Sequence, residues 1–171
     1  GATAIDFAYT VHTNLGHRCR GAKVDGAMVP LNTPLANGQT VEITAIKEGG
    51  PSRDWLNPEL GFLASPRARA KVRAWFNAQV MAETVARGRE AVEKSLQRLG
   101  RTAIRLEDLA SQLGFKSAEG LFEVVGSAAQ ALGRGVELLD FLEITLDGGL
   151  IGLGEQLGGV EFARKFMNLI L

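Results

Sequence analysis

Asp25-Gly26 lies between two short apolar stretches, GAKV at 21–24 and AMVPL at 27–31, and constrains the fold of this chain more than any other feature. Asp-Gly between such stretches is a strong signal for a two-residue β-hairpin, because glycine tolerates the positive φ that a tight turn requires. TVEITAI at 40–46 alternates apolar and polar residues and predicts a further, half-buried strand. The first part of the chain is therefore committed to a sheet.

A helix is predicted just before this hairpin. Thr3 and Asp6 stand three positions apart, which is the spacing of a capping box at a helix start. The apolar residues that follow recur every three or four positions and predict one buried face: Ile5, Ala8, Val11 and Leu15. The helix is expected to end at Gly16. A helix, a hairpin and a strand within about 46 residues predict a small α+β unit.

The remainder of the chain has helical periodicity. KEGGPSRDWLNP at 47–58 is rich in turn residues and predicts a loop, in which Trp55 is expected to be a packing anchor. Pro66 suits a first helical turn, and the helix that follows is expected to end near Gly100, with a weak point at Gly88. Its expected inner face holds Val72, Trp75, Phe76 and Gln79 or Val80. Two shorter helices are expected in LEDLASQLGF and SAEGLFEVV, the second capped by Ser117.

Composition restricts the class of protein. The 171 residues, 46% apolar, suit one globular unit or two small ones. A single cysteine excludes an internal disulfide, and neither a membrane span nor a signal peptide is evident, so we expect a cytoplasmic protein. The net charge is zero, but residues 51–103 carry ten basic and five acidic side chains, so this part can face a polyanion. A solvated helix face would give the same pattern.

Residues 6–26 contain both histidines, His12 and His17, together with the single cysteine, Cys19. Three soft ligands are too few for the usual four-ligand zinc site, so no metal is predicted. Cys19 is not predicted to be a catalytic nucleophile, because no group that could stabilise an oxyanion is evident in the sequence. No GxxxxGK[ST] phosphate loop is present, and no cofactor is predicted. Two interpretations remain open for the histidines: contacts to single-stranded RNA, or cationic groups at a helix end.

The RNA interpretation assigns a role to each polar group of the window. His12 and Tyr9 provide rings for stacking, while Thr13 and His17 provide hydrogen-bonding groups. The basic residues that follow are candidates for phosphate contacts: Arg18, Arg20 and Lys23. A second basic group stands at the start of the long helix, where the pairs 67/71 and 69/73 form two stripes: Arg67, Arg69, Lys71 and Arg73. The alternative for this second group is again a solvated face.

The stretch from GATAIDFAYTVHTNLGHRC through PSRDWLNP to KVRAWF closely resembles the RelA/SpoT family of stringent-response enzymes, and GHRC resembles the RelA branch most. ARGREAVEKSLQRLG and LASQLGFKSAEGLFEVVG match the helical domain that follows in this family. The resemblance implies a ubiquitin-like β-grasp (TGS) domain at 1–50, a linker loop at 51–64, a helical domain at 65–126 and an atypical tail at 127–171. The TGS domain is expected to lack its first hairpin. One hypothesis is that LEITLDGGLIGLG in the tail replaces this hairpin or caps the open edge, and the other is that the tail has no role.

The resemblance also implies a function. The family's enzymes transfer pyrophosphate from ATP to GDP or GTP to make (p)ppGpp, through domains that we do not find in these residues, so no catalysis is expected here. The TGS domain of the family encloses the 3′-CCA end of deacylated tRNA on the ribosome, and its CCA-contacting histidine corresponds to His12. Deacylated tRNA and the ribosome are thus the expected partners. In the SpoT branch the implied partner of the TGS domain is acyl carrier protein, which remains the alternative.

Overall fold

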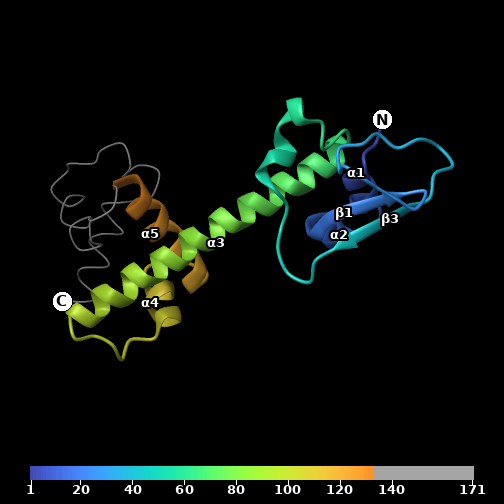
Figure 1. Ribbon diagram of the computed structural model, residues 1–171. Coiled ribbons are helices and arrows are strands. Elements are labelled where there is room, and N and C mark those ends of the chain that lie inside the picture. Colours follow the sequence, from blue (N-terminus) through green and yellow to red (C-terminus); the bar gives the residue numbers. More distant parts are fainter. Residues whose placement is uncertain (133–171) are drawn as a thin grey trace. The chain divides into compact units, whose positions relative to one another are not determined.

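The computed structural model describes residues 1–132, and the predicted hairpin and helix of the C-terminal tail lie outside these residues. The chain divides into two compact units, Gly1–Gln79 and Val80–Leu171. The first unit combines a small antiparallel sheet with helices, and the described part of the second unit is helical (Figure 1). The predicted α+β class is confirmed.

The sheet of the first unit is built around the predicted hairpin. Strands β1 (Cys19–Val24) and β2 (Ala27–Val29) pair through a turn in which Asp25 and Gly26 have φ of 51° and 83°, the conformation of a type I′ turn. Strand β3 (Val41–Ala45) pairs with the other edge of β1, so the order is β2-β1-β3. The register shifts between Cys19 and Gly21, and this bulge releases Arg20 from the ladder.

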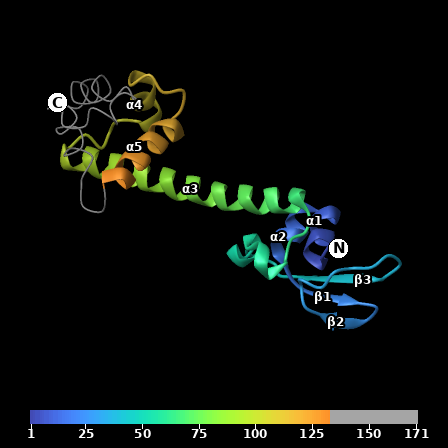
Figure 2. The same cartoon turned by 90° about the horizontal axis from the view of Figure 1, so that it is seen from above.

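Two short helices cover one face of this sheet (Figure 2). The capping box predicted at Thr3 and Asp6 is present at the start of α1 (Ala4–Val11). The helix was expected to continue to Gly16, and this was wrong: the backbone becomes extended at His12, with φ of −159°, and α2 (Thr13–Arg18) starts anew. Val11 is accordingly 58% exposed instead of buried.

Gly16 lies inside α2, and its role is steric. A Cβ at this position would lie 2.3 Å from Cδ1 of Tyr9, so only glycine lets the two helices approach this closely. The break at His12 therefore lets α2 fold back against α1 and bury Tyr9. The core of the first unit contains side chains from α1, the sheet, the loop and the start of the long helix: Ile5, Ala8, Tyr9, Cys19, Trp55, Leu63, Ala68 and Val72. Leu15 of α2 is partly buried and packs against this core.

The predicted loop contains two 3-10 helices, η1 (Arg53–Leu56) and η2 (Pro58–Leu60). Trp55 is the packing anchor that its sequence context predicted, with 5% of its surface exposed. Asp6 fastens the end of this loop to α1, because its carboxylate accepts hydrogen bonds from the backbone N–H groups of Ala64 and Ser65 at 2.9 and 3.1 Å. The loop thus belongs to the core of the first unit.

Helix α3 (Pro66–Arg98) is continuous, and the chain turns at Gly100, which has φ of 68°. The expectation that Gly88 could divide this helix into two was wrong. A Cβ there would lie 1.8 Å from the carbonyl oxygen of Phe122, so this glycine lets α5 (Ala118–Leu132) cross against α3. Val72 is buried, as expected, whereas Val80 is 47% exposed and does not belong to the inner face.

The second unit packs α4 (Leu106–Gln112) and α5 beside the later turns of α3 (Figure 2). Ser117 caps α5 as predicted, because its Oγ accepts a hydrogen bond from the N–H of Gly120 at 3.3 Å. The core is aliphatic and aromatic: Val92, Leu96, Leu109, Ala110, Leu113, Leu121, Phe122 and Val125. None of the helices formed by residues 1–132 combines the length and apolarity needed to cross a bilayer.

Candidate nucleic-acid interface

His12 occupies the junction between α1 and α2, and its conformation is fixed by a cap. Its Nδ1 accepts a hydrogen bond of 3.1 Å from the backbone N–H of Asn14 at the start of α2. An N–H group can only donate, so Nδ1 carries no proton in this arrangement and the proton of the neutral ring is on Nε2. The imidazole is exposed. The junction therefore presents an oriented ring face and an N–H donor to solvent.

The surface around His12 is partly apolar. Val11 is 58% exposed and Phe7, one turn earlier on α1, is 38% exposed. Asn14 is exposed, and Thr13 is half-buried. Apolar side chains beside hydrogen-bonding groups are the combination that an unstacked base requires. Val11 was missed as a surface residue because its spacing placed it on the expected buried face, whereas Phe7 was assigned to no face.

Tyr9 does not share this surface. Only 2% of it is exposed, so the expectation that its ring stacks on RNA is corrected: the ring is a core group. Its hydroxyl lies 2.9 Å from Nδ1 of His17, and the two rings meet edge to face with centroids 5.3 Å apart. Burial, followed by the electrostatic effect of Cys19, raises the pKa of Tyr9. The phenol thus keeps its proton and holds His17.

His17 is half-buried beneath the same junction. Its ring centroid lies 6.3 Å from that of Trp75, which packs edge to face on Phe76 at 5.0 Å. Burial, followed by the positive charge of Lys71, lowers the pKa of His17. Both effects favour the neutral ring. His17 and His12 therefore differ in kind: His17 is a packing residue with a partner inside the unit, and His12 faces solvent.

The environment of Cys19 is unfavourable for a nucleophile. It is buried, and burial raises the pKa of its thiol, so the thiolate is disfavoured. Residues 1–132 contain no group of three or more His, Cys, Asp and Glu side chains placed to hold a metal ion.

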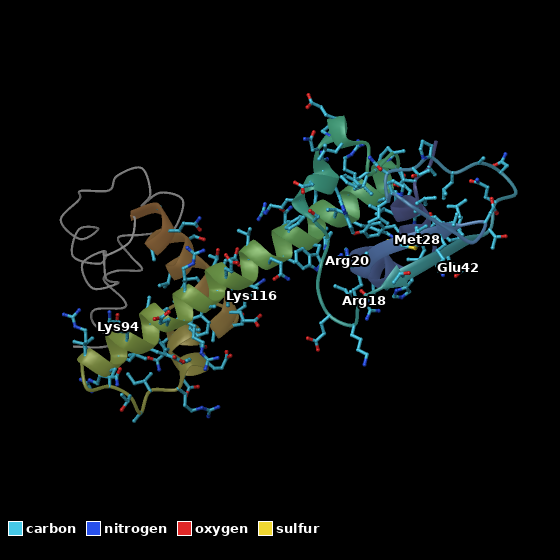
Figure 3. All side chains as sticks on the ribbon, viewed as in Figure 1. Arg18, Arg20, Met28, Glu42, Lys94 and Lys116 are labelled. Atoms are coloured by element: carbon cyan, nitrogen blue, oxygen red, sulfur yellow. The ribbon has the colours of Figure 1, made fainter. Side chains whose placement is uncertain are left out.

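Two of the three basic residues predicted as phosphate ligands, Arg18 at the end of α2 and Arg20 in β1, hold the loop after β3. Arg18 donates from Nη1 to the carbonyl oxygen of Lys47 at 3.1 Å, and Arg20 donates from Nη2 to that of Gly50 at 2.7 Å. Both side chains reach toward this loop from the end of the sheet (Figure 3). Lys23 lies within β1 opposite Glu42. These contacts use part of each guanidinium and leave other N–H groups of Arg18 and Arg20 for a ligand.

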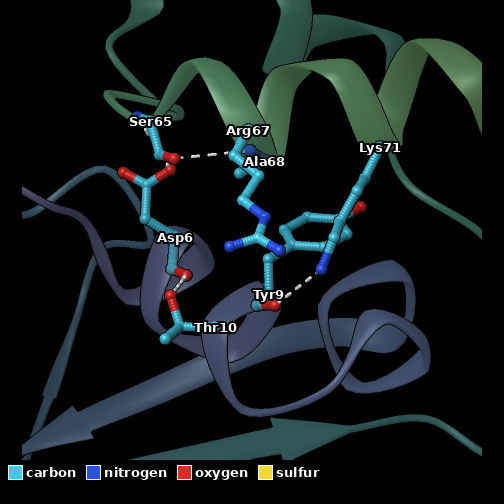
Figure 4. Close-up of a pocket in the computed structure, with 7 residues that line it drawn as sticks. All are labelled: Asp6, Tyr9, Thr10, Ser65, Arg67, Ala68 and Lys71. Carbon is cyan, nitrogen blue, oxygen red and sulfur yellow. Dashed lines mark hydrogen bonds between the residues drawn. The ribbon is translucent and has the colours of Figure 1, made fainter.

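The four basic residues at the start of α3 separate into different environments. Arg69 donates to the carbonyl oxygen of Leu63 at 2.7 Å, and Arg73 is exposed. Arg67 and Lys71 line a cavity of about 140 Å³ between α1 and α3, together with Asp6, Thr10 and Ser65 (Figure 4). Lys71 donates from Nζ to the carbonyl oxygen of Tyr9 at 3.0 Å. The 67/71 stripe thus faces α1, close to the junction that carries His12.

Thr10 and Ser65 were not among the predicted site residues. Neither stands in a recognisable motif, and 55 positions separate them in the chain. Only the packing of α3 on α1 brings them to one cavity.

Comparisons with known proteins place these elements in two families of domains. Residues 1–45 match the TGS domain, and residues 75–134 match the RelA/SpoT AH domain. The chain is 47% identical over 130 residues to the GTP pyrophosphokinase of Photobacterium angustum, an alignment that covers 74% of this chain and 17% of the relative. It is 37% identical over 140 residues to that of Escherichia coli K12, covering 81% of this chain and 19% of the relative.

A third relative is the GTP pyrophosphokinase of Streptomyces antibioticus, 48% identical over 100 residues that cover 57% of this chain and 11% of the relative. The alignments cover less than a fifth of the length of each of these relatives.

Proposed function

Because this chain belongs to the RelA/SpoT family, with its TGS and AH domains, we propose that it is the tRNA-sensing, non-catalytic part of a (p)ppGpp synthetase. Its ligand in this proposal is the 3′-CCA end of deacylated tRNA on the ribosome. The activity of the whole enzyme, pyrophosphate transfer to GDP or GTP, belongs to the same proposal, since the relatives are GTP pyrophosphokinases.

The observation that supports this proposal best is the capped His12. A ring that stacks on a base gains most when it is held in place before the ligand arrives, because less conformational entropy is lost on binding. The hydrogen bond from the N–H of Asn14 fixes the imidazole, and the exposed Nε2–H remains to donate to a base edge or a ribose hydroxyl. The neighbouring Val11 and Phe7 offer apolar contact area.

Selection of deacylated tRNA follows from exclusion. An aminoacyl group on the terminal ribose adds bulk at the position that the site encloses, and a clash excludes a ligand more effectively than a lost contact does. Residues of this junction that contact the 3′ end therefore distinguish the free end from the charged one.

The test separates the role of His12 as a cap from its role as a ligand. Asparagine is a preferred N-cap residue, so His12→Asn should keep α2 while removing the ring, whereas His12→Ala should also lose about 1 kcal/mol of stability. Stacking is worth about 1–3 kcal/mol per base, so both variants should bind a CCA-ended RNA roughly 5- to 150-fold more weakly at fixed salt. Affinity and thermal unfolding are measured on the same samples.

Equal RNA affinity of His12→Asn and the unmodified chain would refute the proposal. Acyl carrier protein is the alternative partner, and competition between it and deacylated tRNA for the same immobilised chain distinguishes the two. Preferential retention of acyl carrier protein would favour the alternative.

A further inference from the structure

The cavity between α1 and the start of α3 is lined by two basic side chains, Arg67 and Lys71, and one acidic side chain, Asp6. Its positive charge therefore exceeds its negative charge. Its one carboxylate, Asp6, already accepts hydrogen bonds from the backbone N–H groups of Thr3, Ala64 and Ser65, at 3.0, 2.9 and 3.1 Å. These donors compensate its charge and hold it at the cavity wall. Among residues 1–132, the ion pairs present do not include one between Asp6 and Arg67.

Arg67 supplies the principal cation. In Figure 4 its guanidinium extends from α3 across α1, between Asp6 and Tyr9. No carboxylate or carbonyl oxygen of the described residues forms a hydrogen bond or ion pair with it. A guanidinium carries its five N–H donors in a planar fork that matches two oxygens of a phosphate.

Lys71 completes the donor set, and Thr10 lines the cavity beside it. The ammonium of Lys71 has three protons and gives one to the carbonyl oxygen of Tyr9, so the others can reach a ligand in the cavity. The hydroxyl of Thr10 donates to the carbonyl oxygen of Asp6 at 2.9 Å, and this bond fixes its position at the cavity wall. Arg67 and Lys71, which lie on the same stripe of α3, thus both line this cavity.

The size of the cavity limits what it can hold. A drug-sized ligand fills about 300–1,000 Å³, well above the 140 Å³ found here. At about 30 Å³ per water molecule the space corresponds to roughly four or five of them, which is the scale of a single tetrahedral anion and smaller than that of a whole nucleoside.

We propose that this cavity binds one phosphate group, and that in the functional complex this group belongs to the backbone of the RNA 3′ end. Thr10 lies two residues before His12, in the last turn of α1, so a strand held at His12 passes the mouth of the cavity. The assignment of the phosphate to RNA rests on the proposed function, whereas the phosphate site itself does not.

The experiment uses the full chain, labelled for NMR, with inorganic phosphate as the first probe. The test variant, Arg67→Gln, removes the cation of the cavity from an exposed position. The control variant, Arg87→Gln, removes the same charge further along α3, where Arg87 forms a surface ion pair with Glu83. Phosphate should shift the amide signals of Thr10 and Ala68 saturably in the unmodified chain and in Arg87→Gln. In Arg67→Gln the affinity should fall at least tenfold, and equal affinity or no saturable shift would overturn the site.

The second probe is a short single-stranded RNA that ends in CCA, titrated at several salt concentrations. Each phosphate contact on a single strand adds about 0.7 to the slope of log K against log salt. Arg67→Gln should lower this slope by about that amount, and Arg87→Gln should leave it unchanged. An unchanged slope with intact RNA binding would reject RNA as the source of the phosphate. Failure of every chain to bind RNA would reject the proposed function, and the phosphate titration would still decide the cavity.

Discussion

The two histidines of this chain are five residues apart and experience different environments. The ring of His12 is exposed and accepts a hydrogen bond from a backbone N–H at Nδ1, whereas the half-buried ring of His17 contacts Tyr9 and Trp75 and is influenced by the charge of Lys71. The difference arises from the helix break at His12, which leaves one ring outside and turns the other toward the core. The residue type alone does not distinguish a ligand from a packing group.

His17 makes stability depend on pH in the acid range. Because burial and Lys71 lower its pKa in the folded chain, the unfolded chain takes up a proton near the ordinary pKa of about 6.5 while the folded chain does not. Stability should therefore decrease as the pH falls from about 6.5 through the lower pKa of the folded state. His17→Gln should flatten this part of the profile in urea unfolding followed between pH 7 and pH 5.

An identical pH profile for His17→Gln and the unmodified chain would show that the folded state does not lower the pKa of His17.

At the scale of elements, two glycines illustrate how packing decides the effect of the same residue. Gly88 and Gly126 lie where α3 and α5 cross, and a Cβ on either would overlap the backbone of the other helix, at 1.8 Å from the carbonyl oxygen of Phe122 and 1.9 Å from that of Thr84. A Cβ on Gly120, also in α5, would lie no closer than 3.8 Å to its nearest neighbours, the side chains of Phe115 and Ser117. The first two glycines permit a helix crossing, and the third only lowers helix propensity.

Gly88→Ala and Gly120→Ala should accordingly shift stability in opposite directions. The added methyl group at Gly88 must push α5 away, which should cost about 1–3 kcal/mol or more, as overpacked cores do. The same methyl group at Gly120 meets no backbone and should stabilise α5 by up to about 1 kcal/mol. Thermal unfolding of the two variants measures both effects, and a Gly88→Ala chain as stable as Gly120→Ala would contradict the crossing.

At the scale of the whole molecule, the part of the chain described here, residues 1–132, forms two cores that share no residue. One is centred on Ile5, Tyr9 and Val72, and the other on Leu109 and Leu121. Helix α3 contributes to both, with Val72 in the first and Val92 in the second. Mutations at distant sites that share no partner have nearly additive effects, so each unit should respond separately to a change in its own core.

Leu121→Ala tests this separation. Leu121 is fully buried, so its truncation should cost about 2–5 kcal/mol, confined to the second unit. Hydrogen exchange should then accelerate in α4 and α5. The amides of β1, and the amide of Asn14 that donates to Nδ1 of His12, should keep their protection and chemical shifts. Equal acceleration in both units would mean that they unfold as one.

The sequence by itself determined the features that depend on a few neighbouring residues. The Asp25-Gly26 hairpin, the capping box of Thr3 and Asp6, and the end of α3 near Gly100 all follow from backbone preferences and hydrogen bonds across three or four positions. His12 could be selected as a candidate ligand from the sequence, because it stands in a stretch that resembles a known family. Its role as a cap could not be predicted, because it depends on where α1 ends.

Only the tertiary structure decided which side chains are exposed and which groups meet. Tyr9 is buried because Gly16 lets α2 pack against it, and Val11 is exposed because α1 ends beside it. Lys71 reaches the carbonyl oxygen of Tyr9 across 62 positions, and Ser65 comes to the same cavity as Thr10. The exposure of a side chain depends on the segment that covers it, and in this unit those segments are distant in the chain.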